Sequence, residues 1–351
     1  LSTGDRSYEI KLGDYSKMDL QRYVSIGDGN VYLVKKDPLN FFDGDLRDMI
    51  DNDKIPSLDE VTEIQFAGRE TYNILYEEDS PRAYSDDDVY IANINGKNLP
   101  LDKSRVDKYL RNISNLNLTD YVTYKASDED LKSYGLDSPE LTVTVKYTEK
   151  DEKNKEIADT FVLNISRDPK ERKDAEKASK KDSKNTEKEE ITAYARVGQS
   201  QIVYKLETDD YRELMAASYD SLRHLEVFPA DFADIKQIDI RLEGNDYIIT
   251  SQKKGNDRTY YYKTEKLDIT DFQKAMENLK ADSFTDESPG EIEEISLTVY
   301  LDNKNYPKLK IQLYRYDGIH CLAVVDREPV SLVKRSDVVA LIEAVHAFVL
   351  K

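Results

Sequence analysis

Short hydrophobic runs and one amphipathic helix pattern alternate along the chain, and this series occurs twice. Between residues 61 and 93, β-branched and aromatic runs are separated by turn residues, which predicts a meander of short strands. A helix is predicted next, because Val106, Leu110 and Ile113 recur at helical spacing. The same order of strands and helix starts again near residue 235. The pattern therefore predicts two copies of one folding unit.

The entry to this helix is the most detailed part of the duplication. Residues 101–104, Leu-Asp-Lys-Ser, reappear as residues 267–270, Leu-Asp-Ile-Thr. Ser104 and Thr270 are each followed three residues later by an acidic or amide side chain, a spacing typical of a capping box. We therefore expect Ser104 and Thr270 to cap the two helices.

Each series continues with further strands and closes with a second helix. In the first series the strand-like runs lie at 141–147, 160–165, 194–197 and 202–206, and the helix lies at 210–222. In the second series they lie at 295–301, 309–314, 322–325 and 329–333, and the helix lies at 337–349. The expected fold class is α+β, with tandem repeated units of mostly antiparallel sheet and two covering helices each.

The N-terminal residues match only the second half of such a unit. Residues 23–32 resemble residues 194–204 in the order and approximate spacing of a tyrosine, a glycine and a second tyrosine. We expect three parts: 1–56, the C-terminal half of a truncated repeat unit; 57–228, a complete repeat unit; and 229–351, a second, shorter repeat unit.

A charged insertion at 167–190 interrupts the first complete unit between two predicted strands. It is rich in Lys, Glu, Asp and Ser. Such a segment buries too little apolar surface to offset the entropy of ordering it. We interpret it as an inserted loop that is either mobile or a solvated helix.

The charge of the chain limits its partners. The 351 residues include 51 Lys and Arg against 70 Asp and Glu, which gives a net charge of −19. This excess argues against nucleic acid as a partner, because like charges repel. The acidic runs at 43–53 and 86–88 lack the spacing of a calcium-binding loop and are interpreted as solvated loops.

No stretch of about 18 apolar residues occurs, so no part of this sequence is expected to span a membrane. The first residue is Leu1 rather than Met. We expect an N-terminal signal or anchor to precede it.

The residues that usually carry catalysis form no recognisable group. His224, His320 and His346 are scattered, and Cys321 lies in an apolar run typical of a buried structural thiol. Common nucleotide-binding, acyl-transfer and zinc-protease motifs are absent from the sequence. We predict no catalytic residue, no cofactor-binding residue and no metal ligand, and we do not expect an enzyme.

Tyrosines are the one group of residues that suggests a binding surface. They are clustered in two short segments, and an exposed sheet face carrying them would suit a ligand or partner. Alternating tyrosines on a half-buried sheet explain the same pattern without any ligand. The candidate surface consists of Tyr260, Tyr261, Tyr262, Tyr314 and Tyr316.

Three motifs together resemble a known family. They are Tyr-Gly-Leu-Asp-Ser-Pro at 134–139 before a β-branched strand, Leu-Pro-Leu-Asp at 99–102 before a helix, and a hairpin within 12–34 that contains Gly-Asp-Gly-Asn-Val-Tyr-Leu-Val. They are similar to the bacterial domain-of-unknown-function family 4340. The resemblance covers most of the chain, but the second unit lacks a clear counterpart of the motif at 134–139.

The resemblance implies an N-terminal membrane helix and an extracytoplasmic body, often encoded near ABC-transporter or gliding-type components. We therefore expect a non-catalytic extracytoplasmic interaction or scaffold protein, anchored to the cell membrane and associated with a membrane transport or cell-envelope assembly. Its partners would be transporter or envelope subunits, and the anchor would be its only contact with the membrane. The alternative is a module that binds polysaccharide or another extracellular ligand on its tyrosine-bearing sheet faces.

Overall fold

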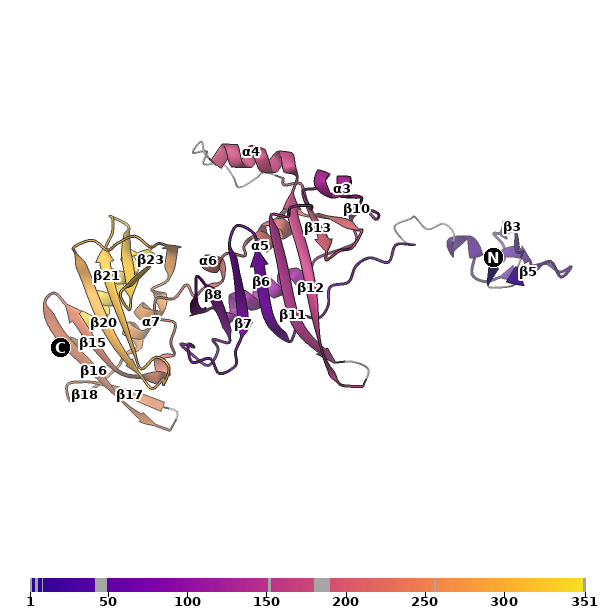
Figure 1. The fold of residues 1–351 in the computed structure, drawn as a ribbon. Coiled ribbons are helices and arrows are strands. Elements are labelled where there is room, and N and C mark those ends of the chain that lie inside the picture. Colours follow the sequence, from indigo (N-terminus) through magenta and orange to yellow (C-terminus); the bar gives the residue numbers. More distant parts are fainter. Residues whose placement is uncertain are drawn as a thin grey trace. The chain divides into compact units, whose positions relative to one another are not determined.

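Two nine-stranded antiparallel sheets form the larger of the two units into which the chain divides (Figure 1). The computed structural model describes residues 2–3, 6–7, 9–41, 49–150, 153–179, 190–255 and 257–349. One unit spans Leu1–Asp53 and the other spans Lys54–Lys351. The predicted fold class, α+β with tandem repeated units, is confirmed.

The strands of the two sheets follow equivalent orders. From edge to edge, the first sheet contains β10 (Tyr121–Thr123), β14 (Val203–Leu206), β13 (Ala193–Val197), β12 (Glu156–Arg167), β11 (Leu141–Lys150), β6 (Val61–Ala67), β7 (Thr71–Tyr76), β8 (Tyr90–Ile94) and β9 (Lys97–Pro100). The second contains β19 (Ala281–Phe284), β23 (Glu328–Lys334), β22 (His320–Val325), β21 (Lys308–Arg315), β20 (Glu293–Leu301), β15 (Ile235–Leu242), β16 (Asn245–Lys254), β17 (Asp257–Tyr262) and β18 (Glu265–Leu267). Strand by strand, the second sheet is a copy of the first.

The duplication extends to an irregularity in the middle of each sheet. Where β6 pairs with β11, the register shifts between the partners of Lys146 and Tyr147, so Thr62 is the extra residue. Where β15 pairs with β20, the shift lies between Ile235 and Gln237. A bulge of this kind bends a strand and increases its twist, so both sheets carry the same local distortion at their first strand.

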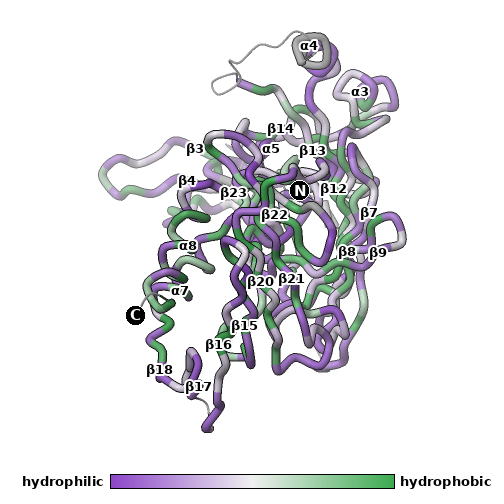
Figure 2. The backbone as a smooth tube through the Cα atoms, turned by 90° about the vertical axis from the view of Figure 1, so that its left-hand side faces the viewer, coloured by the Kyte–Doolittle hydropathy of each residue, from purple (hydrophilic) through white to green (hydrophobic). Residues whose placement is uncertain are grey.

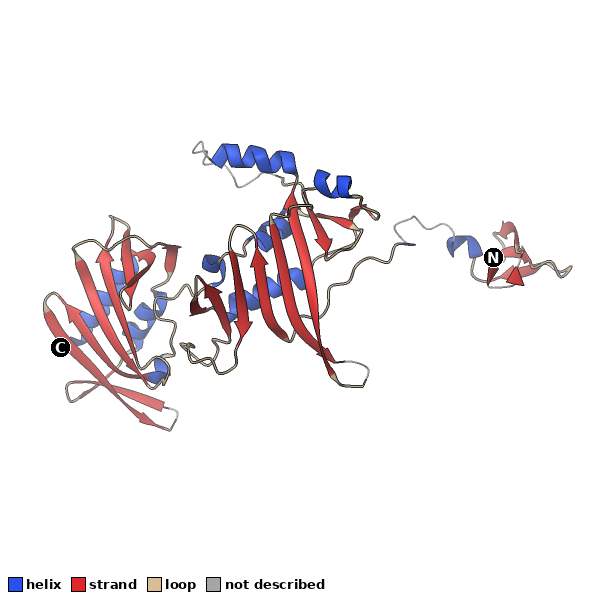
Figure 3. Cartoon of the chain, in the orientation of Figure 1, coloured by secondary structure: helices blue, strands red, loops and turns tan. Residues whose placement is uncertain are grey.

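Helices cover one face of each sheet (Figure 3). In the first repeat these are α2 (Lys103–Ser114), α5 (Thr208–Met215) and α6 (Tyr219–Leu222), and in the second they are α7 (Thr270–Asn278) and α8 (Arg335–Val349). The first repeat adds α3 (Asp128–Ser133), and a 3-10 helix, η2 (Phe232–Asp234), precedes the second sheet. The helix predicted at 210–222 is thus two helices, because the chain leaves the helical conformation at Ala216 and Ser218 caps a new one.

The predicted caps of α2 and α7 are wrong, because the N-cap of α2 is Asp102 and the N-cap position of α7 is Ile269, whose side chain makes no capping hydrogen bond. Asp102, not Ser104, accepts hydrogen bonds from the backbone of the first turn of α2, with its Oδ1 2.8 Å from the Ser104 nitrogen. Asp268 accepts in the same way from the Thr270 nitrogen at 3.0 Å. The Ser104 and Thr270 hydroxyls each donate to that same aspartate oxygen. The repeated Leu-Asp-x-Ser/Thr sequence is therefore a cap in which Asp accepts and Ser or Thr supports it.

Strand alternation separates a buried face from an open face in both sheets. In β21, Leu309, Ile311 and Leu313 are fully buried and the residues between them are more exposed. Figure 2 shows the corresponding change of hydropathy along β20 and β21. The buried side chains of α7 and α8 pack on this face and complete the core of the second repeat.

The turn at residues 134–139, which the second repeat lacks, requires glycine. Gly135 has φ +72°, and a Cβ at this position would lie 2.7 Å from the Ser166 hydroxyl and 3.3 Å from the Arg167 carbonyl oxygen. The turn therefore packs directly on the end of β12, where the charged insertion begins. The insertion begins with α4 (Pro169–Ser179), so its first part is a helix, which was one of the two alternatives, and not a mobile loop. Residues 180–189 lie outside the described part of the chain.

The smaller unit contains a three-stranded sheet of β3 (Lys11–Ser16), β4 (Gln21–Ser25) and β5 (Tyr32–Val34). A two-stranded pair, β1 (Ser2–Thr3) with β2 (Arg6–Ser7), precedes it, and the 3-10 helix η1 (Pro38–Phe41) follows. Gly27 and Gly29 both have positive φ in the connection between β4 and β5, as predicted for a hairpin turn.

Removal of the aspartate cap tests the revised assignment of the helix start. We expect Asp268→Ala to lower the free energy of unfolding by about 1 kcal/mol, because the first turn of α7 loses its acceptor. Asp271→Ala, in the same turn, is the matched control and should cost only a few tenths of that. Urea denaturation of both variants measures the difference, and equal losses would contradict the assignment.

Alanine substitution of two glycines separates backbone strain from steric contact. Gly135 and Gly198 both have positive φ, but a Cβ on Gly198 would meet no atom within 4 Å. We expect Gly198→Ala to cost about 1–2 kcal/mol from strain alone and Gly135→Ala to cost about 1–3 kcal/mol more from overpacking against β12. Thermal melting of the two variants gives the comparison, and an equal loss in both would rule out the close approach.

Candidate functional site

Two of the five candidate tyrosines face the core of the second repeat. Tyr260 is buried, and its hydroxyl donates a hydrogen bond to the Phe232 carbonyl oxygen at 2.8 Å. Burial raises the pKa of Tyr260 to about 12. Tyr262 points to the same side of β17, where its ring lies 5.6 Å from the ring of Phe348. Tyr260 is thus part of the core beside η2, and Tyr262 packs against Phe348 of α8, so both side chains contribute to the packing of the second repeat.

The other three tyrosines face outward but do not form one surface. Tyr261 lies on the open face of β17, and Tyr314 lies on the open face of β21, where its hydroxyl accepts from Gln312 at 2.9 Å. Three strands separate β17 from β21, which places them about 19 Å apart at the usual spacing of strands. Tyr316 is exposed beyond the end of β21 and donates to Glu287 at 2.8 Å. The five candidate tyrosines therefore do not form one continuous surface.

Cys321 is fully buried, as the sequence predicted. Burial raises the pKa of its thiol to about 11, which keeps it protonated at neutral pH and poorly nucleophilic. His320, its neighbour, lies outside the core between Asp317 and Asp282, at 3.2 and 3.3 Å. His346 approaches Glu243 at 3.7 Å. The two imidazoles lie in different surroundings and form no common site.

The loop between β7 and β8 connects the first repeat to the second. Asn303 donates to the Tyr84 carbonyl oxygen and Asn305 donates to the Ser80 carbonyl oxygen, both at 3.0 Å. The ring of Tyr84 lies 4.3 Å from that of Tyr306. These contacts fix the loop against the connection between β20 and β21.

Asp88, at the end of this loop, corrects the interpretation of the acidic run 86–88 as solvated. Asp86 and Asp87 are exposed, but Asp88 is only 2% exposed. It accepts from the backbone nitrogen of Tyr84 at 2.7 Å and lies 2.8 Å from the Nε2 of His224. The run 43–53 falls largely outside the described residues.

A shallow pocket of about 290 Å³ lies beside the turn at 134–139. Gly135, Ser138 and Ser166 line it on one side, and Lys132, Arg172 and Lys173 line it with Asp137. Arg172 also approaches Glu140 at 3.4 Å. The lining has more cationic than anionic side chains, which distinguishes it from the acidic chain as a whole.

One face of the sheet in the smaller unit carries apolar side chains that are partly exposed. Cross-strand partners share a face, and the register pairs Leu12 with Val24 and Val24 with Tyr32. Val24 is buried, whereas Leu12 is 36% exposed and Tyr32 is 42% exposed. Tyr15, which pairs with Arg22 on this side, is 42% exposed. We call this surface the β3–β5 face; it consists of Leu12, Tyr15, Arg22, Val24, Tyr32 and Val34.

Arg22 organises one end of the β3–β5 face. Its Nε donates to Asp37 at 2.6 Å, another of its nitrogens donates to the Gly13 carbonyl oxygen at 2.7 Å, and its guanidinium lies 5.8 Å from the ring of Tyr15. The hydrogen bond from Arg22 lowers the pKa of Asp37. The two side chains therefore hold η1 next to β3 and β4.

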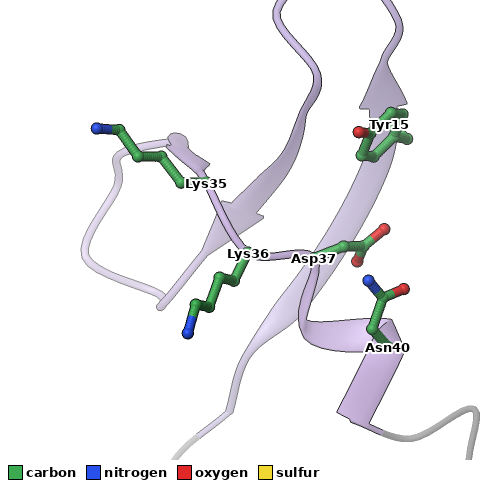
Figure 4. Close-up of a pocket in the computed structure, with 5 residues that line it drawn as sticks. All are labelled: Tyr15, Lys35, Lys36, Asp37 and Asn40. Atoms are coloured by element: carbon green, nitrogen blue, oxygen red, sulfur yellow. The ribbon is translucent and has the colours of Figure 1, made fainter.

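A cavity of about 490 Å³ opens at this end of the face (Figure 4). Tyr15, Asp37 and Asn40 lie on one side of it, and the side chains of Lys35 and Lys36 extend away from them. An apolar face beside paired charges is typical of a surface that contacts another protein. Sequence analysis predicted the hairpin, but it did not predict that this face is exposed.

In the part of the chain that the structure describes, no helix is both long and apolar enough to cross a membrane.

Comparison with known proteins identifies one family. Residues 93–299 match a domain of unknown function, DUF4340, and this segment includes most of the first repeat and the first half of the second. No curated protein and no solved structure is detectably similar to the chain. Because the match covers more than half of the sequence, the chain belongs to the DUF4340 family.

Proposed function

We propose that this protein is a non-catalytic interaction or scaffold protein that acts outside the cytoplasm, anchored to the cell membrane, within a membrane transport or cell-envelope assembly. Its partners are transporter or envelope subunits, and nucleic acid is not among them. One observation carries the interaction part of the proposal, namely the exposure of the β3–β5 face.

The β3–β5 face corresponds to the core face of a complete repeat. If Tyr23 and Gly27 are matched with Tyr194 and Gly198, Val24 takes the place of Ala195. Ala195 is fully buried in the first sheet. Val24 is the only buried apolar residue among residues 9–40, whose burial the structure describes, so the equivalent face of the smaller unit has little cover.

An isolated three-stranded sheet of this size gains stability by burying such a face. In the complete repeat, β12 pairs along its length with β11. β3, the counterpart of β12, has no neighbour on that side in the described part of the chain. We therefore propose that the occupant is a polypeptide segment of a partner protein, which adds a strand to β3 and places apolar side chains on Leu12, Tyr15 and Tyr32.

The net charge of −19 supports the choice of a protein partner over nucleic acid. The location outside the cytoplasm and the association with transport or envelope components follow from what the family resemblance implies. The alternative, a module that binds polysaccharide with tyrosines, is left with Tyr261, Tyr314 and Tyr316, since Tyr260 and Tyr262 are packed inside.

Charge substitutions on the β3–β5 face test this proposal. We expect the full-length double variant Leu12→Asp and Tyr32→Asp to lose transporter or envelope subunits during purification in mild detergent. The amount of copurified subunit should fall about tenfold or more, because charged side chains on this face oppose apolar contact. The measurement is quantitative mass spectrometry of the copurified subunits.

Ile248→Asp is the matched control, because Ile248 is 50% exposed on β16 of the second repeat. It should copurify the same subunits as the unmodified protein. Thermal unfolding followed by circular dichroism checks that the double variant keeps the unfolding transition of the larger unit. Equal recovery of subunits with the double variant would refute the proposed surface, and recovery of none with the unmodified protein would refute the scaffold function itself.

A further inference from the structure

Three potential metal ligands converge where the first repeat leads into the second. Asp102, His224 and Glu226 each offer one ligand atom, and these atoms lie within 4.8 Å of one another. Asp102 precedes α2, and the other two follow α6. All three residues are partly buried.

Backbone hydrogen bonds bring these segments together. The Asp102 nitrogen donates to the Leu222 carbonyl oxygen at 3.2 Å, which holds the start of α2 against the end of α6. The segment around Glu226 is fixed to the second repeat, because the nitrogens of Val227 and Ala281 donate to the carbonyl oxygens of Leu279 and Leu225. The cluster is therefore built on secondary structure from both repeats and not on a free loop.

The surroundings of His224 orient its ring. Its Nε2 lies 2.8 Å from Oδ1 of Asp88, a side chain that is 1% exposed. The other oxygen of Asp88 accepts from the nitrogens of Tyr84 and Ser85 at 2.7 and 3.3 Å. A carboxylate only accepts hydrogen bonds, so a neutral imidazole donates Nε2–H to it and leaves Nδ1 with a free lone pair. This carboxylate–histidine arrangement is the usual support of a metal-binding imidazole.

The two carboxylates each keep an oxygen for an ion. Oδ1 of Asp102 is occupied by the cap of α2, which leaves Oδ2. Oε1 of Glu226 lies 3.0 Å from the Lys280 ammonium, which is 52% exposed. The Arg105 backbone nitrogen donates to Asp102, but the Nε of its side chain donates to the Ser221 carbonyl oxygen at 2.9 Å. Asp88, Asp102 and Glu226 thus place three carboxylates around one imidazole, a charge arrangement that suits a divalent cation.

The donor set indicates the class of metal. One imidazole nitrogen and two carboxylate oxygens, without thiolate, suit zinc and related divalent ions, and three protein ligands leave a fourth position open. Tetrahedral zinc holds its ligand atoms about 3.4 Å from one another, so side-chain rotations would close the present spacing around an ion.

We propose that Asp102, His224 and Glu226 bind a divalent ion of the zinc type, and that Asp88 is a positioning residue that orients the imidazole. The bound ion links the first helix of one repeat to the segment that enters the next. It stabilises the junction, because an ion that binds only the folded state raises the stability of that state. This inference is independent of the proposed partner surface.

Zinc titration of the full chain tests the site. After treatment with a chelator and its removal, calorimetry with Zn²⁺ alone should show one saturable site per chain, and saturating Zn²⁺ should raise the melting temperature. His224→Gln should abolish both effects. His320→Gln is the matched control, because His320 also lies between two carboxylates, Asp317 and Asp282, and it should leave both effects unchanged.

Asp88→Asn tests the positioning role. Loss of such a support typically lowers metal affinity about 10–100-fold, and we expect this reduction together with a shifted visible absorption spectrum of the Co²⁺-substituted protein. A purely structural role would change the stability of the metal-free protein and leave the Co²⁺ spectrum as it is.

Three results would overturn the proposal. They are the absence of saturable Zn²⁺ binding, an equal loss of binding in His224→Gln and His320→Gln, and a melting temperature that Zn²⁺ does not change. Each would mean that the hydrogen bond between His224 and Asp88 only supports the fold and that the cluster holds no ion. If His224→Gln does not fold, Glu226→Gln replaces it, because Glu226 is partly exposed and its amide keeps a similar shape.

Discussion

The pairing of β6 with β11, and of β15 with β20, is the constraint on which each repeat depends. All the remaining strands of each sheet lie on one side or the other of this central pair. The pair joins the strands that precede the first helix to the strands that follow it, so one helix from each half covers the shared face. In the described part of the smaller unit, the three-stranded sheet has no such central pair, and its Leu12 and Tyr32 are exposed.

Much of this architecture could be predicted from the sequence because the chain repeats it. The period of the hydrophobic residues located the long strands and the helices that end each repeat, and the duplication supported each assignment twice. The short edge strands β9, β10, β18 and β19 were not predicted, because three or four residues with few apolar side chains carry no periodic signal. The cap was assigned to Ser104 when Asp102 forms it, since both residue types suit an N-cap and the sequence does not fix the first helical residue.

The side chains of the candidate sites were harder to place than the strands. Three consecutive tyrosines at 260–262 give no polar–apolar alternation, so the sequence could not say which of them faces the core. Asp88 looked solvated because two aspartates precede it, yet its partner His224 lies 136 residues further along the chain. Contacts between residues so far apart in the sequence depend on the tertiary fold, and the only local signal was the pair His224 and Glu226, which one residue separates.

The second repeat serves as an internal comparison for the cluster at the junction. Asp268, one residue before the N-cap position of α7, shares two of the contacts that Asp102 makes at α2, to the backbone nitrogen and the hydroxyl two residues further on. Capping therefore explains why an aspartate stands at both positions, and it does not by itself indicate an ion. Within the described residues, a group of three ligands within 4.8 Å occurs at Asp102 and not at Asp268. The difference comes from the segment that follows α6, which brings His224 and Glu226 beside the duplicated aspartate. The aspartate at the start of the helix is common to both repeats, whereas its ligand neighbours lie in the segment after α6, so the geometry of the cluster is a property of the junction and not of the repeat.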